Sequence, residues 1–357
     1  MLSQSVPVKI LFLYTEVMPY TLSTIKCLLH AAAEVHVVYW DTKKLTPFFP
    51  TPLPGAFFYK RSFFNSYSLL ALTNKLQPDI TLVSGWQDNA YLYVSFRLRA
   101  NNYKVVCGLD GHKFLTLKKL FASIIAKFGC FSFFFSHAWV AGPYQYEYAR
   151  MLGFKKEAII FDLYSADLSL FDLTYRNRIA SVHIDYPHRF LFVGRFEHIK
   201  GIDILLDSWH SLNLERKDWE LHLIGNGSNC LESNRHCGII VKSFMTSESL
   251  SNEALNAGCF VLPSRFEPWG VVVHEFASAG LPLILSDSVG SSSTFLINGM
   301  NGYKFSAGTN PVASLSNALL KVINSSDSTL FDFGSFSNSL SKRITPVTSA
   351  MNLLSIL

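Results

Sequence analysis

Residues Val261–Gly290 read VLPSRFEPWGVVVHEFASAGLPLILSDSVG, and this stretch decides the fold of the second half of the chain. Its order of residue types predicts a strand, a loop, a helix, a turn and a second strand. The apolar run Cys259–Leu262 is typical of a buried strand. A helix is expected to open at Trp269–Gly270 and to end at Gly280, because glycine commonly terminates helices. Leu283–Leu285 then form the next strand.

Two carboxylates belong to this unit: Glu267 in the loop and Glu275 eight positions later. A helix that starts near Gly270 places Glu275 roughly 8 Å along its axis, at about 1.5 Å per residue. The helix N-terminus offers free N–H groups and partial positive charge to a diphosphate. The acids would then reach hydroxyls on either side, as a nucleotide-diphosphate sugar requires. The alternative is two solvated glutamates on an ordinary helix.

Composition excludes several classes of protein. The chain has 357 residues, of which 49% are hydrophobic and 16% charged, so it predicts two folded domains and excludes disorder. A net charge of +5 without an arginine-rich run argues against nucleic acid. The six cysteines form no C-x-x-C pair, so neither structural zinc nor a disulfide framework is expected.

The N-terminus has no basic leader region with a cleavage site, and no uninterrupted apolar run reaches the ~20 residues of a membrane span. We therefore expect a cytoplasmic protein. The segment Lys118–Phe135 joins lysines to aromatic and aliphatic residues. It predicts either contact with a membrane interface or a core helix and strand of the first domain.

Apolar strands alternate with helices along most of the chain, which predicts parallel sheets covered on both faces. The fold class is α/β, with two doubly wound, Rossmann-like domains and a ligand in the cleft between them. The predicted parts are an N-terminal acceptor-binding domain over 1–165, a linker over 166–188, a C-terminal nucleotide-sugar-binding domain over 189–345 and a tail over 346–357. The Ser- and Asn-rich segment Asn324–Ser341 carries no convincing helical pattern.

A strand followed by glycine and two cations predicts an anion site. Phe190–Val193 is followed by Gly194 and Arg195, and Lys200 precedes the next helix. Glycine lets the backbone approach a ligand, Arg195 can hold phosphate oxygens with two hydrogen bonds, and Lys200 adds a mobile charge. The alternative is a solvated turn with two surface cations.

Two further strand ends are candidates. Gly225 and Gly227 follow a strand, but Cys230 stands where a dinucleotide fingerprint needs its third glycine, so a turn beside the ligand is the better interpretation. Asp110 and His112 follow another strand, and either could orient or deprotonate an acceptor hydroxyl. A turn stabilised by Asp and Gly is the alternative.

The chain contains no D-x-D and no spacing typical of metal ligands. We therefore expect no metal and no cofactor. The charge of a phosphate would be balanced by Arg195, Lys200 and a helix N-terminus. The absence of G-x-S-x-G and Walker A motifs removes serine hydrolases and P-loop NTPases.

Taken together, VGRFEHIKGIDILL, LIGNG, the stretch Val261–Gly290 and INGMNGYKF resemble the group 1, or family 4, glycosyltransferases of the GT-B fold. The resemblance covers about Phe190–Phe305, and the E-x7-E pair is its most specific part. The family implies a retaining, metal-independent transferase that uses a nucleotide-diphosphate sugar. Many members assemble bacterial surface polysaccharides such as O-antigen, capsule or exopolysaccharide on a lipid carrier.

The resemblance also implies roles for residues. Glu267 would face the donor sugar and Glu275 the ribose, while the backbone of Gly270 and Val271 meets the sugar or the β-phosphate. Trp269 departs from the small residues common there and predicts a differently shaped sugar pocket. The donor set is implied to comprise Gly194, Arg195, Lys200, Gly225, Gly227, Glu267, Trp269, Gly270, Val271 and Glu275.

The first strand–helix loop departs from the family because Met18-Pro19-Tyr20-Thr21 replaces its usual glycine pair. The prediction is a cytoplasmic glycosyltransferase, peripheral on the inner face of the membrane, that uses a UDP- or GDP-sugar and a lipid-linked or oligosaccharide acceptor. A non-catalytic nucleotide-sugar or glycan binder is the alternative. A nicotinamide-dependent oxidoreductase shares the architecture but lacks the phosphate fingerprint.

Overall fold

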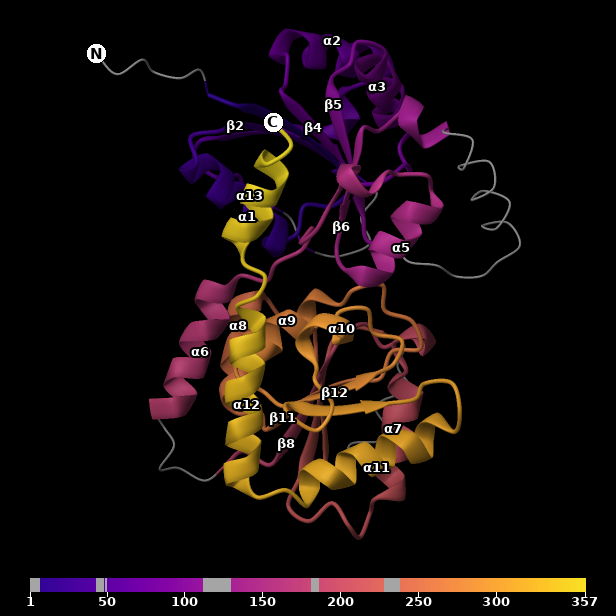
Figure 1. The fold of residues 1–357 in the computed structure, drawn as a ribbon. Coiled ribbons are helices and arrows are strands. Elements are labelled where there is room, and N and C mark those ends of the chain that lie inside the picture. The colour runs from indigo at the N-terminus through magenta and orange to yellow at the C-terminus, as the bar shows by residue number, and fades with distance from the viewer. Residues whose placement is uncertain (1–6, 43–47, 49, 112–129, 181–185, 228–237) are drawn as a thin grey trace. The chain divides into compact units, whose positions relative to one another are not determined.

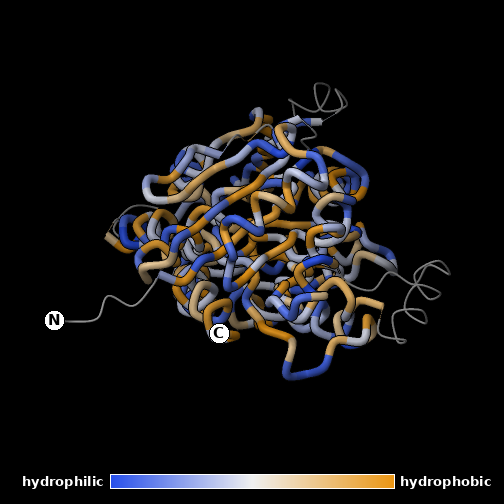
Figure 2. The backbone as a smooth tube through the Cα atoms, turned by 90° about the horizontal axis from the view of Figure 1, so that it is seen from above, coloured by the Kyte–Doolittle hydropathy of each residue, from blue (hydrophilic) through white to orange (hydrophobic). Residues whose placement is uncertain are grey.

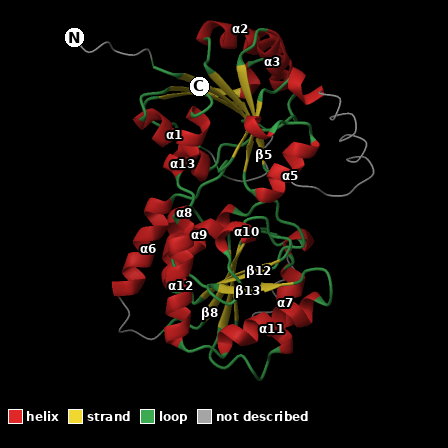
Figure 3. Cartoon of the chain, viewed as in Figure 1, coloured by secondary structure: helices red, strands yellow, loops and turns green. Residues whose placement is uncertain are grey.

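The computed structural model describes residues 7–42, 48, 50–111, 130–180, 186–227 and 238–357. The chain forms two compact units: residues 1–165 with 346–357 make up unit 1, and residues 166–345 make up unit 2. In each unit a parallel sheet is covered by helices (Figure 3). The predicted α/β fold with two Rossmann-like domains is confirmed.

Unit 1 is built on a parallel seven-stranded sheet in the order β3-β2-β1-β4-β5-β6-β7. Its strands are β1 (Lys9–Tyr14), β2 (Glu34–Tyr39), β3 (Ala56–Lys60), β4 (Ile80–Val83), β5 (Lys104–Leu109), β6 (His137–Val140) and β7 (Ile159–Ile160). The central strands are buried on both faces, as continuous apolar runs such as KILFLY predict. Strand β3 falls directly after the proline-rich stretch and was not predicted.

The helices of unit 1 pack in pairs: α1 contacts α13, and α2 contacts α3 (Figure 1). They are α1 (Pro19–His30), α2 (Ser66–Leu76), α3 (Asn89–Ala100), α5 (Pro143–Met151) and α13 (Pro346–Leu354), with 3-10 turns η1 (Arg61–Phe63), η2 (Cys130–Phe133) and η3 (Lys156–Ala158). The helix predicted over Leu117–Phe128 lies outside the described residues, as does most of Lys118–Phe135.

Unit 2 has a parallel six-stranded sheet in the order β10-β9-β8-β11-β12-β13. Its strands are β8 (Arg189–Val193), β9 (Glu220–Ile224), β10 (Ile239–Lys242), β11 (Cys259–Leu262), β12 (Leu283–Ser286) and β13 (Gly302–Phe305). Its helices are α6 (Leu168–Ala180), α7 (Ile202–Ser211), α8 (Ser247–Leu255), α9 (Val271–Ser278), α10 (Ser292–Phe295), α11 (Pro311–Ile323) and α12 (Asp327–Ser341), with the turn η4 (His198–Lys200).

The prediction of a linker over 166–188 is wrong, because helix α6 occupies most of these residues. Only one large apolar side chain of this helix, Phe171, is buried, and it packs on Phe276 with ring centroids 6.1 Å apart. The helix also buries Arg178, which donates to the carbonyl oxygen of Ala257 at 2.6 Å. Because a buried arginine and few apolar residues attach this helix to unit 2, its sequence lacks the regular spacing of apolar residues that predicts a helix.

The Ser- and Asn-rich segment is also a helix, α12. It packs on α9 through small residues: a Cβ on Gly334 would lie 2.2 Å from the carbonyl oxygen of Gly280. Asn338 is buried and donates to the carbonyl oxygen of Ser278 at 2.6 Å. Small and polar residues can form the buried face of a helix when they pack closely and their polar groups are hydrogen-bonded. Hydropathy alone therefore does not predict this helix.

The predicted C-terminal tail is helix α13, which packs on α1 in unit 1. Its Leu353 is buried, and the amide of Asn352 donates to Oδ2 of Asp162 at 3.0 Å. The last residues therefore complete the unit formed by the first part of the chain. Among the described residues, no helix combines the length and apolar character needed to cross a membrane. Figure 2 shows hydrophobic and hydrophilic segments alternating along the backbone.

Candidate active site

Glycines draw the loops after β8 and β9 together. The N–H of Gly194 donates to the carbonyl oxygen of Ile224 at 3.0 Å. Gly225 has a φ of +157°, and a Cβ there would lie 1.8 Å from the Gly194 carbonyl oxygen. A Cβ on Gly227 would lie 2.4 Å from the Cβ of Phe196. Side chains at these glycines would separate the loops, so the predicted ligand-side glycines set the spacing of the loops.

The two predicted cations have different surroundings. The side chain of Arg195 is 54% exposed and donates to Oε1 of Glu197 at 2.9 Å. Lys200 is 18% exposed, and its ammonium group donates to Oε2 of Glu267, which is 12% exposed. The structure therefore brings Lys200 and Glu267 together across 67 residues of sequence, whereas Arg195 forms a local ion pair with Glu197, two residues away.

A close backbone contact places Lys200 near Glu267. Gly201 follows Lys200 with a φ of +69°, and a Cβ there would lie 2.0 Å from the carbonyl oxygen of Pro263 in the loop after β11. Beside this contact, Arg265 donates to both carboxylate oxygens of Asp203, each at 2.6 Å. The start of α7 and the loop that carries Glu267 are thus joined by a glycine contact and a bidentate ion pair.

The N-terminus of α9 is formed by a left-handed glycine. Gly270 has a φ of +88° and precedes Val271, the first helical residue, whose side chain is partly exposed. The hydroxyl of Ser291 donates to the Gly270 carbonyl oxygen at 3.3 Å. The backbone of Glu267 is hydrogen-bonded to the neighbouring loop, because its N–H donates to the carbonyl oxygen of Ser288 at 3.2 Å. Because first-turn N–H groups of a helix have no intrahelical partner, this end of α9 suits an anion.

Trp269 serves as the packing anchor of this loop. Its side chain is 2% exposed and meets the ring of Phe295 edge to face, with centroids 6.2 Å apart. Its buried indole N–H has no hydrogen-bond partner among the described residues. The structure therefore gives Trp269 a role in holding Gly270 and Val271 in position, which the sequence did not predict.

Glu275 lies on the second turn of α9 and is partly buried. Burial, together with the nearby charge of Asp167, raises the pKa of its carboxyl group to about 7. The carboxyl therefore exchanges its proton near neutral pH. A group that switches between donor and acceptor in this range is well suited to binding hydroxyls.

His274 is a site residue that sequence reasoning missed. Its imidazole is fully buried and stacks on Phe295 with centroids 4.3 Å apart. Nδ1 accepts from the N–H of Ala166 at 3.1 Å, and Nε2 lies 2.8 Å from the carbonyl oxygen of Ser341. Burial lowers its pKa to about 4, so the ring is neutral and ties both ends of unit 2 to the helix of Glu275. A histidine within an apolar run was the only sequence signal.

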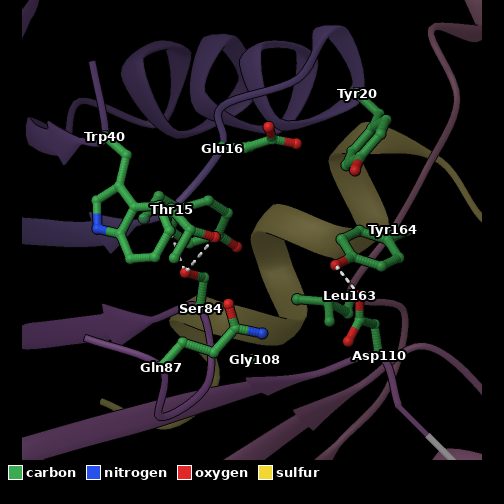
Figure 4. A pocket seen from close by; sticks show the side chains of 11 residues that line it. Thr15, Glu16, Tyr20, Trp40, Ser84, Gln87, Gly108, Asp110, Leu163 and Tyr164 are labelled. Carbon is green, nitrogen blue, oxygen red and sulfur yellow. Dashed lines mark hydrogen bonds between the residues drawn. The ribbon is translucent and has the colours of Figure 1, made fainter. Parts of the chain in front are cut away.

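Unit 1 contains a polar pocket of about 200 Å³ at the carboxyl ends of its strands. Asp110 follows β5, and its Oδ2 accepts from the hydroxyl of Tyr164 at 3.2 Å (Figure 4). The amide of Gln145 donates to the Asp110 carbonyl oxygen at 3.0 Å. The residues that line the pocket are Tyr14, Thr15, Glu16, Tyr20, Trp40, Ser84, Gln87, Gly108, Asp110, Leu163 and Tyr164.

The pocket combines aromatic rings with hydrogen-bonding groups. Burial raises the pKa of Tyr14 and of Tyr164, and the charge of Asp110 raises both further, so the phenols stay protonated. The rings of Tyr20 and Tyr164 meet at 5.0 Å between centroids. A carboxylate, phenols and flat rings are the groups that bind the hydroxyls and faces of a sugar.

Sequence reasoning found one residue of this pocket, Asp110. Glu16 and Trp40 also follow strands, β1 and β2, and that position was the available signal. Tyr20 is the second residue of α1, which begins at Pro19, so the structure places it in the helix and not in the strand–helix loop where the family's glycine pair is expected. His112, the other predicted acceptor-side residue, lies outside the described residues.

Comparison with solved structures defines the class of fold. The chain is similar over 98% of its length to an Anabaena protein, Alr3699/HepE, solved with UDP-glucose, at a TM-score of 0.69 and 15% identity, covering all of that chain. It is similar in the same way to sucrose-phosphate synthase from Thermosynechococcus elongatus, at a TM-score of 0.71, 15% identity and 98% coverage of both chains. The fold is that of the GT-B glycosyltransferases.

Residues 187–325 match the sequence model of a family described as "Glycosyl transferases group 1". Within this segment the predicted resemblance is confirmed. The curated relatives include an uncharacterised glycosyltransferase of Methanocaldococcus jannaschii, 30% identical over 119 residues, covering 31% of this chain and 30% of the relative.

Lipopolysaccharide 1,6-galactosyltransferase of Salmonella typhimurium is 28% identical over 133 residues, covering 35% of this chain and 37% of the relative. The chain thus spans about a third of the length of the curated relatives that it matches.

Proposed function

We propose that the protein is a retaining glycosyltransferase that moves a sugar from a UDP- or GDP-sugar to a hydroxyl of a lipid-linked or oligosaccharide acceptor. The observation that carries this proposal is the Lys200–Glu267 pair beside the N-terminus of α9, with Glu275 one turn further along the same helix. The family match over residues 187–325 includes all of these residues.

In this proposal unit 2 binds the donor. The diphosphate lies at the N–H groups of Gly270 and Val271, with Lys200 and Arg195 as counter-charges. Glu267 accepts from hydroxyls of the sugar and Glu275 from the ribose. Lys200 is paired with Glu267 in the structure, so a bound diphosphate would share its ammonium group. Gly194, Gly225 and Gly227 keep the backbone loops thin enough for this approach.

The acceptor is proposed to bind in the pocket of unit 1, where Asp110 and its partner Tyr164 present hydrogen-bonding groups. Asp110 orients the attacking hydroxyl, and His112 belongs to the same strand end in sequence. Neither group needs to form a covalent bond to the sugar. Their contribution would be to hold the reacting oxygen in position, which lowers the entropic part of the barrier.

The proposed chemistry breaks the bond between the anomeric carbon and the β-phosphate oxygen, and forms a bond from that carbon to the acceptor oxygen on the same face. The leaving phosphate takes the proton of the acceptor hydroxyl, so the atoms balance without a further base. Lys200, Arg195 and the end of α9 stabilise the charge that develops on the phosphate. No metal or cofactor is needed in this scheme.

The acceptor class is supported by one relative, the lipopolysaccharide 1,6-galactosyltransferase of Salmonella typhimurium. Of the similar structures, that of lipopolysaccharide outer core galactosyltransferase WaaB covers 98% of this chain and 100% of its own, at a TM-score of 0.66 and 16% identity. We therefore propose a role in the synthesis of surface polysaccharide at the inner face of the cytoplasmic membrane.

Donor-dependent stabilisation tests the function. Thermal unfolding is followed with UDP-, GDP-, ADP- and dTDP-sugars. A donor at a hundred times its Kd should add about 2.7 kcal/mol to the stability of the unit that binds it. One nucleotide class should stabilise the protein and then be consumed with an acceptor, giving a product with the donor's anomeric configuration. No stabilisation by any donor, or an inverted product, contradicts the proposal. A donor that binds but is never consumed indicates the non-catalytic binder.

Donor affinity should also depend on the ionisation of Glu275. The pKa of about 7 lies above the ordinary 4.5, so the folded protein keeps this proton between those values. Without ligand, stability contributed by this group falls as pH rises through that window. A ribose diol binds the ionised carboxylate, so the Kd of a UDP-sugar should increase about tenfold for each pH unit below 7.

The control is Glu275→Gln, which cannot titrate. Its affinity for the UDP-sugar should be weaker and nearly independent of pH between 5 and 8. The intact sugar nucleotide is the right probe, because its esterified diphosphate does not gain a proton in this range. A wild-type affinity that is flat with pH would remove the ribose role of Glu275.

A further inference from the structure

An exposed aromatic face lies on unit 1, over η1, α2, α3 and η2. We define it by Phe63, Tyr67, Tyr93, Phe96 and Phe133. Four of these side chains are strongly exposed: Tyr67 at 75%, Phe63 at 74%, Phe133 at 60% and Phe96 at 45%. Large aromatic side chains are ordinarily buried, so four exposed in one region point to an interaction surface.

The elements that carry this face are joined by contacts. Helices α2 and α3 pack together (Figure 1), and the rings of Tyr67 and Tyr93 lie 5.7 Å apart across that contact. Phe96 on α3 meets Phe134, the neighbour of Phe133, with centroids 6.0 Å apart. These ring contacts link α2 to α3 and α3 to the end of η2, and the ion pair of Arg61 with Asp88 joins η1 to the start of α3.

The charge around this face is positive. Between residues 56 and 100 the chain carries the cations Lys60, Arg61, Lys75, Arg97 and Arg99, and the acids Asp79 and Asp88. The charge of Asp88 is already matched by Arg61, at 2.8 Å. Asp41, which follows β2, also lies beside η1, where its carboxylate accepts from the hydroxyl of Ser62 at 2.6 Å, so five cations stand against three acids. Lys75 and Arg97 are exposed and have no ion pair among the described residues. Helices α2 and α3 contain no acidic residue.

We propose that the aromatic face binds the surface of a bilayer that contains anionic lipid. Aromatic side chains insert at the level of the headgroups, and flanking lysine and arginine side chains meet the phosphates. Such binding is interfacial and requires no spanning helix. The binding of lipid itself does not depend on the proposed function. Its role does rest on that proposal, because a membrane would carry the lipid-linked acceptor.

Flotation of the full chain with lipid vesicles tests this inference. Vesicles of phosphatidylglycerol and phosphatidylethanolamine should carry the protein upward at low salt, and vesicles of phosphatidylcholine should carry much less. Phe63→Ser combined with Phe96→Ser should weaken binding about tenfold or more. Lys75→Gln combined with Arg97→Gln should weaken it about fivefold for each cation, an effect that 1 M salt reproduces in the wild type.

The matched control is Leu214→Ser in unit 2, since Leu214 is 94% exposed but lies outside the aromatic face. It should float like the wild type. Wild-type protein that stays at the bottom with anionic vesicles overturns the inference, as does equal binding by the Phe63→Ser, Phe96→Ser variant. Self-association that this variant abolishes, without vesicle binding, would assign the face to a second copy and overturn it too.

Empty vesicles need neither donor nor turnover, so this result is separate from the test of the proposed function. Protein that floats but binds no nucleotide sugar contradicts only the transferase proposal. Protein that transfers sugar to a soluble acceptor but does not float contradicts only the membrane inference. All of the substituted side chains are exposed, and equal thermal stability of the variants would confirm that the fold is intact.

Discussion

Lys200→Ala is expected to reduce kcat/KM by a factor of about 10² or more, as loss of one group that stabilises a developing oxyanion does. Lys200 is the less exposed of the two predicted phosphate cations, and its ammonium group lies against Glu267. Its removal takes away charge at the diphosphate and leaves a poorly exposed carboxylate without its partner. That carboxylate would then repel the donor phosphates. Steady-state kinetics with the donor identified by thermal stabilisation measure the effect.

Two further variants separate charge from folding. Lys304→Ala removes an exposed lysine of unit 2, and its kcat/KM should stay within about twofold of the wild type. Lys200→Ala with Glu267→Gln removes both members of the pair and should restore thermal stability, but not turnover. Near-normal kinetics in Lys200→Ala would rule out the proposed donor site. Arg195→Ala is expected to act in the same direction, since Arg195 is assigned to the same diphosphate.

Gly201→Ala is expected to destabilise unit 2 by roughly 2–4 kcal/mol, combining backbone strain with overpacking. The added Cβ would stand 2.0 Å from the carbonyl oxygen of Pro263, at a backbone φ of +69°. The loop must shift, and Lys200 next to it must move away from Glu267. The variant should therefore lose stability and donor-induced stabilisation together. Chemical denaturation with and without the donor measures both.

Gly308→Ala is the matched control for this substitution. Gly308 is also in unit 2, is exposed, and has no atom closer than 4.0 Å to an added Cβ. Its stability should change by no more than about 0.5 kcal/mol. If Gly201→Ala were as stable as Gly308→Ala and bound the donor equally well, the contact with Pro263 would have no part in positioning Lys200.

The donor side of the candidate site is largely readable from sequence because it is local. Glu267, Gly270 and Glu275 lie within nine consecutive residues, and the loop and helix that carry them follow from glycine and proline signals. The ion pair between Lys200 and Glu267 is different. It depends on the contact between Gly201 and Pro263, and no pattern along the chain reveals which loops meet after folding.

The acceptor-side pocket of unit 1 depends on tertiary structure to a greater extent. Its lining comes from the ends of β1, β2, β4 and β5, from Tyr20 of α1 and from residues 163–164. Parallel strands bring these ends to one edge, but the sequence does not state which side chain at each end turns into the pocket. Asp110 was found because a charged residue after an apolar strand is conspicuous, whereas Trp40 was hidden among other aromatic residues.

The sequence by itself determined the α/β class, the two parallel sheets and the glycosyltransferase resemblance of about Phe190–Phe305, because apolar strands and short motifs consist of consecutive residues. Only the tertiary structure decided that residues 168–180 and 327–341 are helices, that the last residues join unit 1, and that His274 ties α9 to both ends of unit 2. The physical reason is that buried polar contacts stabilise these elements. A hydrogen bond depends on which groups lie close together in the folded chain, and the order of hydropathy along the sequence does not give that information.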